Sequence, residues 1–320
     1  MTAIGFHVSH EQLHPTEGLR VSRLAQDAGF DAAMCSDHLA PWSERQGESG
    51  FTWSWLGAAL ATTDLSFGTV CAPGQRYHPV IVAQAIATLG AMYPGRFWVA
   101  LGSGEYLNEH VTGDPWPAKA ERDARLVECV EVIRALLRGE EVDHTGRVVA
   151  RQARLWTLPE VLPALIGPAL TPATAGRHAA WADGLITVNK PVEEVRQVID
   201  AYREAGGAGE VALQVHIAWA PTSAEAEAVA IDQWSTITGP PHVTEDTPTT
   251  AAFDALGRNV GIADVRRAVL VSADLGEITA RLAELRDAGA DRLYLHQVGR
   301  QQDAFIETFA EHVLPALRGE

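Results

Sequence analysis

The residues best suited to proton chemistry lie directly after short apolar runs of the sequence. Asp37 and His38 follow the run Ala32–Cys35, and the segment Gly102–Glu105, which ends on a carboxylate, follows another run. Imidazole titrates near neutral pH, so a histidine beside a carboxylate can act as a general acid or base. Adjacent strand residues point to opposite faces, so we expect Asp37 and His38 to contact different ligand groups. Alternatively, Asp37 caps a turn and His38 lies on the surface.

Histidines lie at the ends of several apolar runs, and together they could bind a metal ion. They are residues 7, 38, 216 and 296. However, His7 and His10 have the wrong spacing for two strand residues to share one face, which requires every second residue. Most strand-end histidines are simply hydrogen-bonded. We therefore predict no metal site.

A parallel sheet must position these residues, because the apolar runs show little polar alternation. The expected strands are Ile4–Val8, Ala32–Cys35, Leu65–Cys71, Phe97–Leu101, Ala164–Ile166, Leu185–Val188, Val211–Ala218 and Arg292–Leu295. Amphipathic helical patterns separate them, and helices end on glycines that lead into strands at Ala28–Asp31 and Ala288–Asp291. About eight such units predict an α/β fold, a single (β/α)8 TIM barrel over residues 1–320. A doubly wound sheet is the alternative, but no GxGxxG follows an early strand.

Two long segments interrupt this pattern, Leu39–Thr52 and Thr236–Gly261. Long connections in a compact domain are usually functional, so we expect these loops to shape a substrate pocket.

Composition limits the possible partners. The chain has 320 residues, 25 Lys+Arg against 41 Asp+Glu, and a net charge of −16. An acidic surface repels phosphate backbones and anionic lipids, which argues against nucleic acid and membrane partners. Three cysteines without metal-binding spacing fit a reducing compartment. With no signal peptide visible, we expect a cytoplasmic protein acting on a small molecule.

Four segments resemble the bacterial luciferase-like flavin and deazaflavin oxidoreductases. They are SDHLAPWSERQGESGFTWSWLGAAL (36–60), APGQRYHPVIVAQAIATL (72–89), YPGRFWVALGSGEYLNE (93–109) and ERDARLVECVEVIRALLRGE (121–140). Within that family the chain is most similar to the branch of coenzyme F-420 (F420)-dependent glucose-6-phosphate dehydrogenase and the related probable non-F420 flavinoid oxidoreductases. The resemblance covers nearly the whole chain, and relatives of this class are commonly homodimers.

The resemblance implies roles for three groups of residues. His38 and Glu105 would form the catalytic acid/base pair, and Trp42 and Glu11 would lie near the reacting carbon. Cofactor contacts fall on Asp37, Cys71, Ala72, Ser103, Gly104, Asn108, Gly167 and Pro168. Thr187 and Lys190 match residues that hold the sugar phosphate in the dehydrogenase. The family also often has a cis peptide near the end of the third strand, here around Val70–Ala72.

The chain also departs from the dehydrogenase pattern. Ala72 replaces a threonine that contacts the cofactor, and Gly167-Pro168 replaces a Gly-Gly turn at the cofactor phosphate. Of the cations around the sugar phosphate, only Lys190 aligns clearly. These changes disfavour glucose 6-phosphate and the anionic tail of F420, so we slightly favour FMN over F420.

The expected activity is hydride transfer between a small organic substrate and the cofactor ring. The alternatives are a reduced-FMN-dependent monooxygenase, a flavin-binding protein without turnover and, more distantly, a zinc hydrolase.

Overall fold

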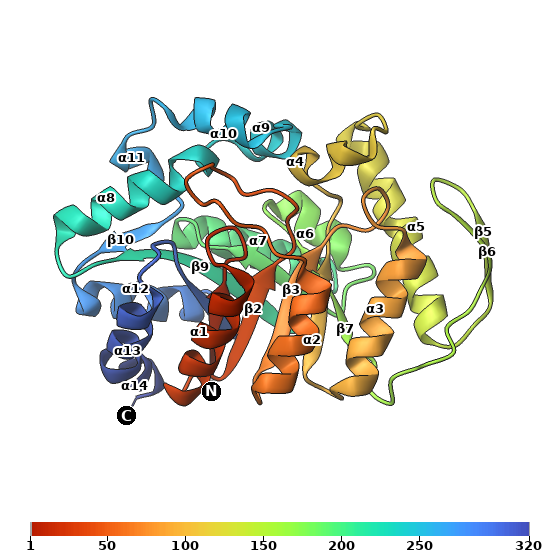
Figure 1. The fold of residues 1–320 in the computed structure, drawn as a ribbon, viewed down its shortest axis with the longest axis horizontal. Helices are drawn as coiled ribbons and strands as arrows, with labels where there is room; N and C mark the ends of the chain where they lie inside the picture. Colours follow the sequence, from red (N-terminus) through yellow and green to blue (C-terminus); the bar gives the residue numbers. More distant parts are fainter. Residues whose placement is uncertain (1, 320) are drawn as a thin grey trace.

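The computed structural model describes residues 2–319 and contains a closed barrel of parallel strands (Figure 1). Pairing of β9 with both β8 and β11 closes the ring, which confirms the predicted TIM barrel. Its strands, in their order around the barrel, are β1 (Ala3–Val8), β2 (Ala32–Ser36), β3 (Ser66–Cys71), β4 (Phe97–Leu101), β7 (Ala164–Pro168), β8 (Gly184–Val188), β9 (Val211–Trp219) and β11 (Arg292–Gln297).

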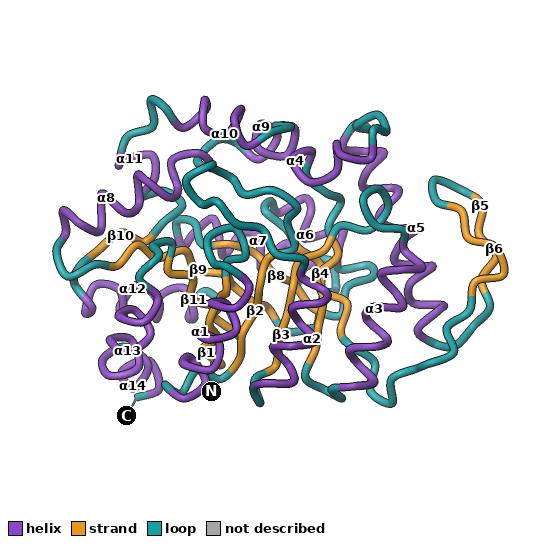
Figure 2. Tube along the Cα trace, in the orientation of Figure 1, coloured by secondary structure: helices purple, strands orange, loops and turns teal. Residues whose placement is uncertain are grey.

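Helices surround this barrel and cover the rim at the carboxyl ends of its strands (Figure 2). Several begin with a proline whose missing N–H would have no partner in the first turn. At α1, α3 and α6 the preceding residues, His14, His78 and Thr171, each accept a hydrogen bond from the first turn. The helices are α1 (Pro15–Asp27), α2 (Thr52–Thr62), α3 (Pro79–Met92), α4 (Tyr106–Glu109), α5 (Lys119–Leu137), α6 (Pro172–His178), α7 (Val192–Glu204), α8 (Ser223–Trp234), α9 (Pro241–Asp246), α10 (Thr250–Gly257), α11 (Ile262–Val265), α12 (Leu275–Asp287), α13 (Gln302–His312) and α14 (Leu314–Arg318).

Several of these elements differ from the sequence-based expectation. The segment Thr236–Gly261, predicted as a loop, carries α9 and α10, and the Thr249 side chain caps α10. A polar hairpin, β5 (Val142–Thr145) and β6 (Val149–Ala153), projects from the side of the barrel (Figure 1). The short strand β10 (Leu270–Ser272) pairs in parallel with the end of β9. Hairpin strands without an apolar face, and a strand of three residues, give little sequence signal. The peptide bonds around Val70–Ala72 are trans, so the expected cis bond is absent there.

Most of the core lies between the barrel and its helices, and a smaller cluster fills the barrel itself. In that inner cluster two aromatic side chains occupy space left by glycines. The Trp98 ring lies against Gly68, its register partner on β3, and Tyr294 lies against Gly5. The Trp98 indole N–H donates to the Tyr294 hydroxyl over 3.2 Å. The pair therefore closes the barrel below the strand ends.

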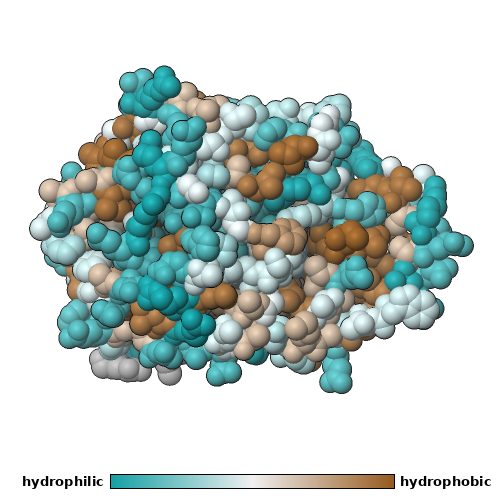
Figure 3. Space-filling view, in the orientation of Figure 1, coloured by the Kyte–Doolittle hydropathy of each residue, from teal (hydrophilic) through white to brown (hydrophobic). Residues whose placement is uncertain are grey.

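The surface is largely polar. Hydrophilic side chains cover much of the face in Figure 3, and apolar side chains form separate small groups. Between residues 2 and 319, no helix has the length and apolar character needed to cross a membrane.

We predict that Gly68→Ala destabilises the fold by about 2–3 kcal/mol, because its methyl group would lie 1.9 Å from the Trp98 ring. Gly57→Ala in α2 is the matched control, since nothing lies within 4 Å of its added methyl group. That control should be neutral or stabilising by up to about 1 kcal/mol. Urea unfolding measures both variants, and equal stabilities would contradict the packing described here.

Candidate active site

A cavity of about 310 Å³ lies at the carboxyl ends of the barrel strands, where TIM-barrel enzymes carry their active sites. Residues of α9 and the preceding loop line its outer side. Most of the predicted site residues also line it, namely Glu11, Asp37, His38, Trp42, Cys71, Ala72, Ser103, Gly104, Glu105, Asn108, Pro168 and Thr187. The structure therefore brings together residues from six different strand ends.

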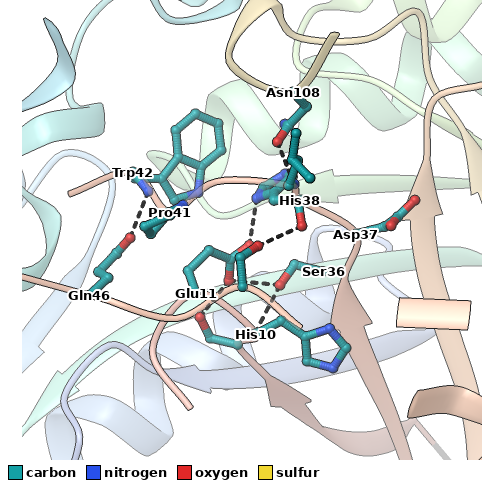
Figure 4. A network of polar contacts seen from close by, with 12 residues as sticks. His10, Glu11, Ser36, Asp37, His38, Pro41, Trp42, Gln46 and Asn108 are labelled. Atoms are coloured by element: carbon teal, nitrogen blue, oxygen red, sulfur yellow. Dashed lines mark hydrogen bonds and ion pairs between the residues drawn. The ribbon is translucent and has the colours of Figure 1, made fainter. Parts of the chain in front are cut away.

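A buried ion pair between Glu11 and His38 lies at one wall of the cavity (Figure 4). Glu11 Oε1 is 2.5 Å from His38 Nδ1, and the Glu11 side chain is only 3% exposed. The hydroxyls of Ser9 and Ser36 each donate to Glu11 Oε2 over 2.7 Å. On the other side of the ring, His38 Nε2 is 3.5 Å from Glu105 Oε2. One imidazole therefore lies between two carboxyl groups.

The charges of this group follow from its contacts. Burial raises the pKa of Glu11, but the close His38 charge and the hydrogen bonds from Ser9 and Ser36 outweigh burial and lower it well below its usual value. Burial lowers the pKa of His38, but Glu11 outweighs burial and raises it. Burial raises the pKa of Glu105. Glu11 is thus anionic, His38 is biased toward its imidazolium form, and Nε2 is the nitrogen placed for proton exchange.

Asp37 faces a different environment, as predicted from strand alternation. Its side chain points away from that of His38 (Figure 4) and accepts a hydrogen bond of 3.0 Å from the Tyr77 hydroxyl. Arg76 lies between Asp37 and Glu109, with its Nη2 3.4 Å from Asp37 Oδ2 and its Nε 3.7 Å from Glu109 Oε1. Burial raises the pKa of Asp37, and Arg76 opposes this. Asp37 Oδ2 has no hydrogen bond within residues 2–319.

Sequence reasoning missed Arg76, Tyr77 and Glu109 as site residues. The signal was present in the sequence, since all three fall inside two of the segments that carry the family resemblance. Their roles depend on contacts between the loop after β3 and α4, which no local pattern reveals.

Asn108 and Gly104 fix the backbone at the cavity mouth. Asn108 Oδ1 accepts from the Leu39 N–H over 2.8 Å, and its Nδ2 is 3.4 Å from Glu105 Oε2. Gly104 has φ +90°, and a Cβ there would lie 3.1 Å from Glu109 Cγ. A side chain at position 104 would therefore be strained and crowded.

Two predicted site residues do not line the cavity. A Cβ on Gly167 would lie 2.7 Å from His178 Cβ, so this glycine faces α6, while its neighbour Pro168 faces the cavity. Lys190 donates its Nζ proton to the Leu170 carbonyl and lies behind the cavity wall. Gly167 and Lys190 thus lie outside the cavity lining, and their expected roles at the cofactor and the substrate stay predictions.

Three buried histidines, His7, His216 and His296, line the cavity from β1, β9 and β11. Burial lowers the pKa of His7 and of His216 to about 3, and lowers that of His296 well below its usual value. Nearby His10 is also buried, and burial lowers its pKa to about 4. Among residues 2–319 no group of three or more His, Cys, Asp or Glu side chains is arranged to hold a metal ion.

Comparison with known proteins shows the family of the chain. The protein family described as luciferase-like monooxygenase matches residues 1–292. The chain belongs to this family. It is an oxidoreductase of the luciferase-like class, as the sequence resemblance implied.

The curated relatives include the F420-dependent glucose-6-phosphate dehydrogenases of Nocardia farcinica and Beutenbergia cavernae. The first is 33% identical over 98% of both chains, and the second is 33% identical over 99% of this chain and 98% of its own. An F420-dependent secondary alcohol dehydrogenase, solved with an F420-acetone adduct, is 28% identical over 99% of both chains with a TM-score of 0.91. These names give no support to the preference for FMN.

We predict that the free energy of unfolding falls steeply as the pH drops from 7 to 5.5. His7, His10, His216 and His296 stay neutral in the folded chain, whereas in the unfolded chain they take up protons below their ordinary pKa of 6.5. Each then lowers stability by up to about 1.4 kcal/mol per pH unit. His38 acts oppositely, because its raised pKa adds stability that is lost as pH rises through the folded pKa.

Urea unfolding at several pH values measures this slope. His216→Phe removes one of the four groups and should reduce the slope by about a quarter. A stability that does not change between pH 7 and 5.5 would contradict the neutral, buried state of these histidines.

Proposed function

We propose that the chain is an F420-dependent dehydrogenase that transfers a hydride between a small uncharged alcohol or ketone and the cofactor. The observation that carries this proposal is the Glu11–His38 pair, which presents Nε2 of a charge-stabilised imidazole at the cavity. The names of the relatives and of the similar solved structure support F420 in place of FMN.

The residues at the ends of β3 and β4 fit a flat, polar ring. Gly102, Ser103 and Gly104 present small side chains to the cavity, with Cys71 and Ala72 beside them. Asp37 Oδ2 is a buried acceptor that has no hydrogen bond in the described chain. An N–H group of the cofactor ring would need such an acceptor. We propose that these residues hold the ring of F420, which accepts or donates a hydride when bound.

The chain itself supplies proton transfer and position. In its neutral form His38 takes the hydroxyl proton at Nε2 as an alcohol is oxidised, and the negative charge of Glu11 stabilises the resulting imidazolium. The Trp42 ring packs edge-on to His38 with centroids 4.8 Å apart, and Phe253 of α10 packs against Trp42 at 5.0 Å. These aromatic contacts hold the imidazole in place and keep water from this wall.

The charges around the cavity disfavour a phosphorylated substrate. Among the described residues that line the cavity, the Lys and Arg side chains are Arg76 and Lys119. Arg76 is paired with Asp37 and Glu109, and Lys119 with Asp123. A phosphate dianion usually needs cations that are not already neutralised. We therefore propose a neutral alcohol as substrate, although the curated relatives are named for glucose 6-phosphate.

A protein that only binds the cofactor would need no proton-exchanging pair, and Glu11 with His38 argues against that alternative. The monooxygenase alternative has no specific support in the geometry. Two solved monooxygenases with a similar fold are 22% and 14% identical to this chain, which is evidence of the fold alone.

We predict that F420 quenches the tryptophan fluorescence of the purified protein at lower concentration than FMN does. Neutral secondary alcohols should then reduce bound F420, and His38→Ala should lower kcat at least about a hundredfold with little change in the Kd for F420. His312→Ala, an exposed change on α13, is the control for handling and folding.

Absorbance of oxidised F420 follows the turnover. Tight binding of FMN alone would contradict the proposed cofactor, and unchanged turnover in His38→Ala would remove His38 from proton transfer.

A further inference from the structure

A second hydrogen-bonded chain lies at the ends of β9 and β11, beside β1. His216 Nδ1 is 3.0 Å from His296 Nδ1, and His296 Nε2 is 3.0 Å from Gln12 Oε1. His216 and His296 are register partners on β9 and β11. The mechanism proposed above uses none of these three residues, although both histidines line the cavity.

The orientation of the Gln12 amide decides which atoms carry protons. Gln12 Nε2 donates to the carbonyl of Val298 at 2.5 Å and to Gln233 Oε1 at 2.9 Å. A backbone carbonyl can only accept, so the Gln12 nitrogen must face Val298 and its oxygen must face His296. Gln12 Oε1 is therefore an acceptor, and the proton between it and His296 belongs to His296 Nε2.

The protonation of His296 also decides which nitrogen of His216 carries a proton. Burial keeps His296 neutral, so with Nε2 protonated its Nδ1 is a bare acceptor. The proton between the two rings therefore lies on His216 Nδ1. Burial keeps His216 neutral as well, which leaves its Nε2 as a bare lone pair. This Nε2 has no hydrogen-bond partner within residues 2–319.

The surroundings of His216 are largely aromatic. The Trp234 ring lies 4.5 Å from the His216 ring and 5.0 Å from that of His296, and all three side chains line the cavity. The titratable groups that act on the pair are His7 and Glu11, and burial also keeps His7 neutral. An anionic ligand would meet a lone pair here with no cation beside it, whereas a hydroxyl could donate into it.

We infer that His216 Nε2 accepts a hydrogen bond from a second hydroxyl or N–H of the substrate, so that the preferred substrates are uncharged diols or polyols. This inference rests on the proposed function, because the first hydroxyl is the one oxidised at His38. His216 is thus a specificity residue, and His296 with Gln12 position it by fixing its tautomer.

The kinetic test compares linear diols with their mono-O-methyl ethers, using the F420-loaded enzyme. Each ether keeps one oxidisable hydroxyl but cannot donate to His216. The ratio of kcat/KM for diol over ether should be about tenfold or more at the best chain length in the wild type, the usual value of one hydrogen bond. In His216→Phe this ratio should approach one, whereas His10→Phe, a buried change outside the cavity lining, should keep it.

A spectroscopic test on the unmodified protein does not depend on folding of a variant. Nitrogen NMR with labelled histidine should show His216 protonated at Nδ1 and bare at Nε2, with no titration between pH 5 and 8, and His296 protonated at Nε2. A proton on His216 Nε2 would overturn the inference.

The kinetic outcomes separate the two proposals. Oxidation of alcohols with an equal diol-to-ether ratio in wild type and His216→Phe overturns the inference alone. A loss of F420 affinity in His216→Phe that matches the loss of kcat/KM would assign His216 to the cofactor and also overturn it. Failure of every alcohol to reduce F420 overturns the proposed function and the inference with it.

Discussion

The arrangement of this site depends on a buried charge pair, Glu11 with His38. Removing two charges from water costs several kcal/mol, which the protein recovers only with close contact and further hydrogen bonds. Ser9 and Ser36 supply those bonds to the carboxylate, and Asn108 and Ser49 hold the backbone that follows β2. The pairing of β1 with β2 brings the segments that carry Glu11 and His38 side by side. The barrel therefore favours the charged form of His38 before any ligand binds.

The cavity combines two electrostatic environments. On the side of β2, β3 and β4, carboxyl groups alternate with His38 and Arg76. Burial and neighbouring charges shift the pKa values of Asp37, His38 and Glu105. On the side of β9 and β11, the histidines are neutral and bonded to one another. Proton exchange needs the first environment, because it requires a group whose charge can change. Recognition of an uncharged substrate fits the second, since neutral imidazoles offer direction without net charge.

The sequence predicted the barrel, and most of the predicted site residues line the cavity, because strand ends of a parallel barrel converge on one face and apolar runs reveal those ends. It could not specify the side-chain orientations and contacts that depend on tertiary structure. Gly167 and Pro168 are neighbours, and only the strand's rotation decides which faces the cavity. Lys190 stands at a strand end but bonds to a carbonyl behind the wall. The partners of Arg76 and the tautomers of His216 and His296 come from contacts between distant segments. The preference for FMN rested on two loop changes, and the relatives give it no support.

The most direct test of this account is the titration of His38 by NMR in the wild type and in Glu11→Gln. The account predicts a His38 pKa above the ordinary 6.5 in the wild type, because the Glu11 charge outweighs burial. In Glu11→Gln the charge is gone and burial remains, so the pKa should fall below 6.5. A His38 pKa that is the same in both proteins, or below 6.5 in the wild type, would contradict the claim that Glu11 sets the charge of the catalytic imidazole.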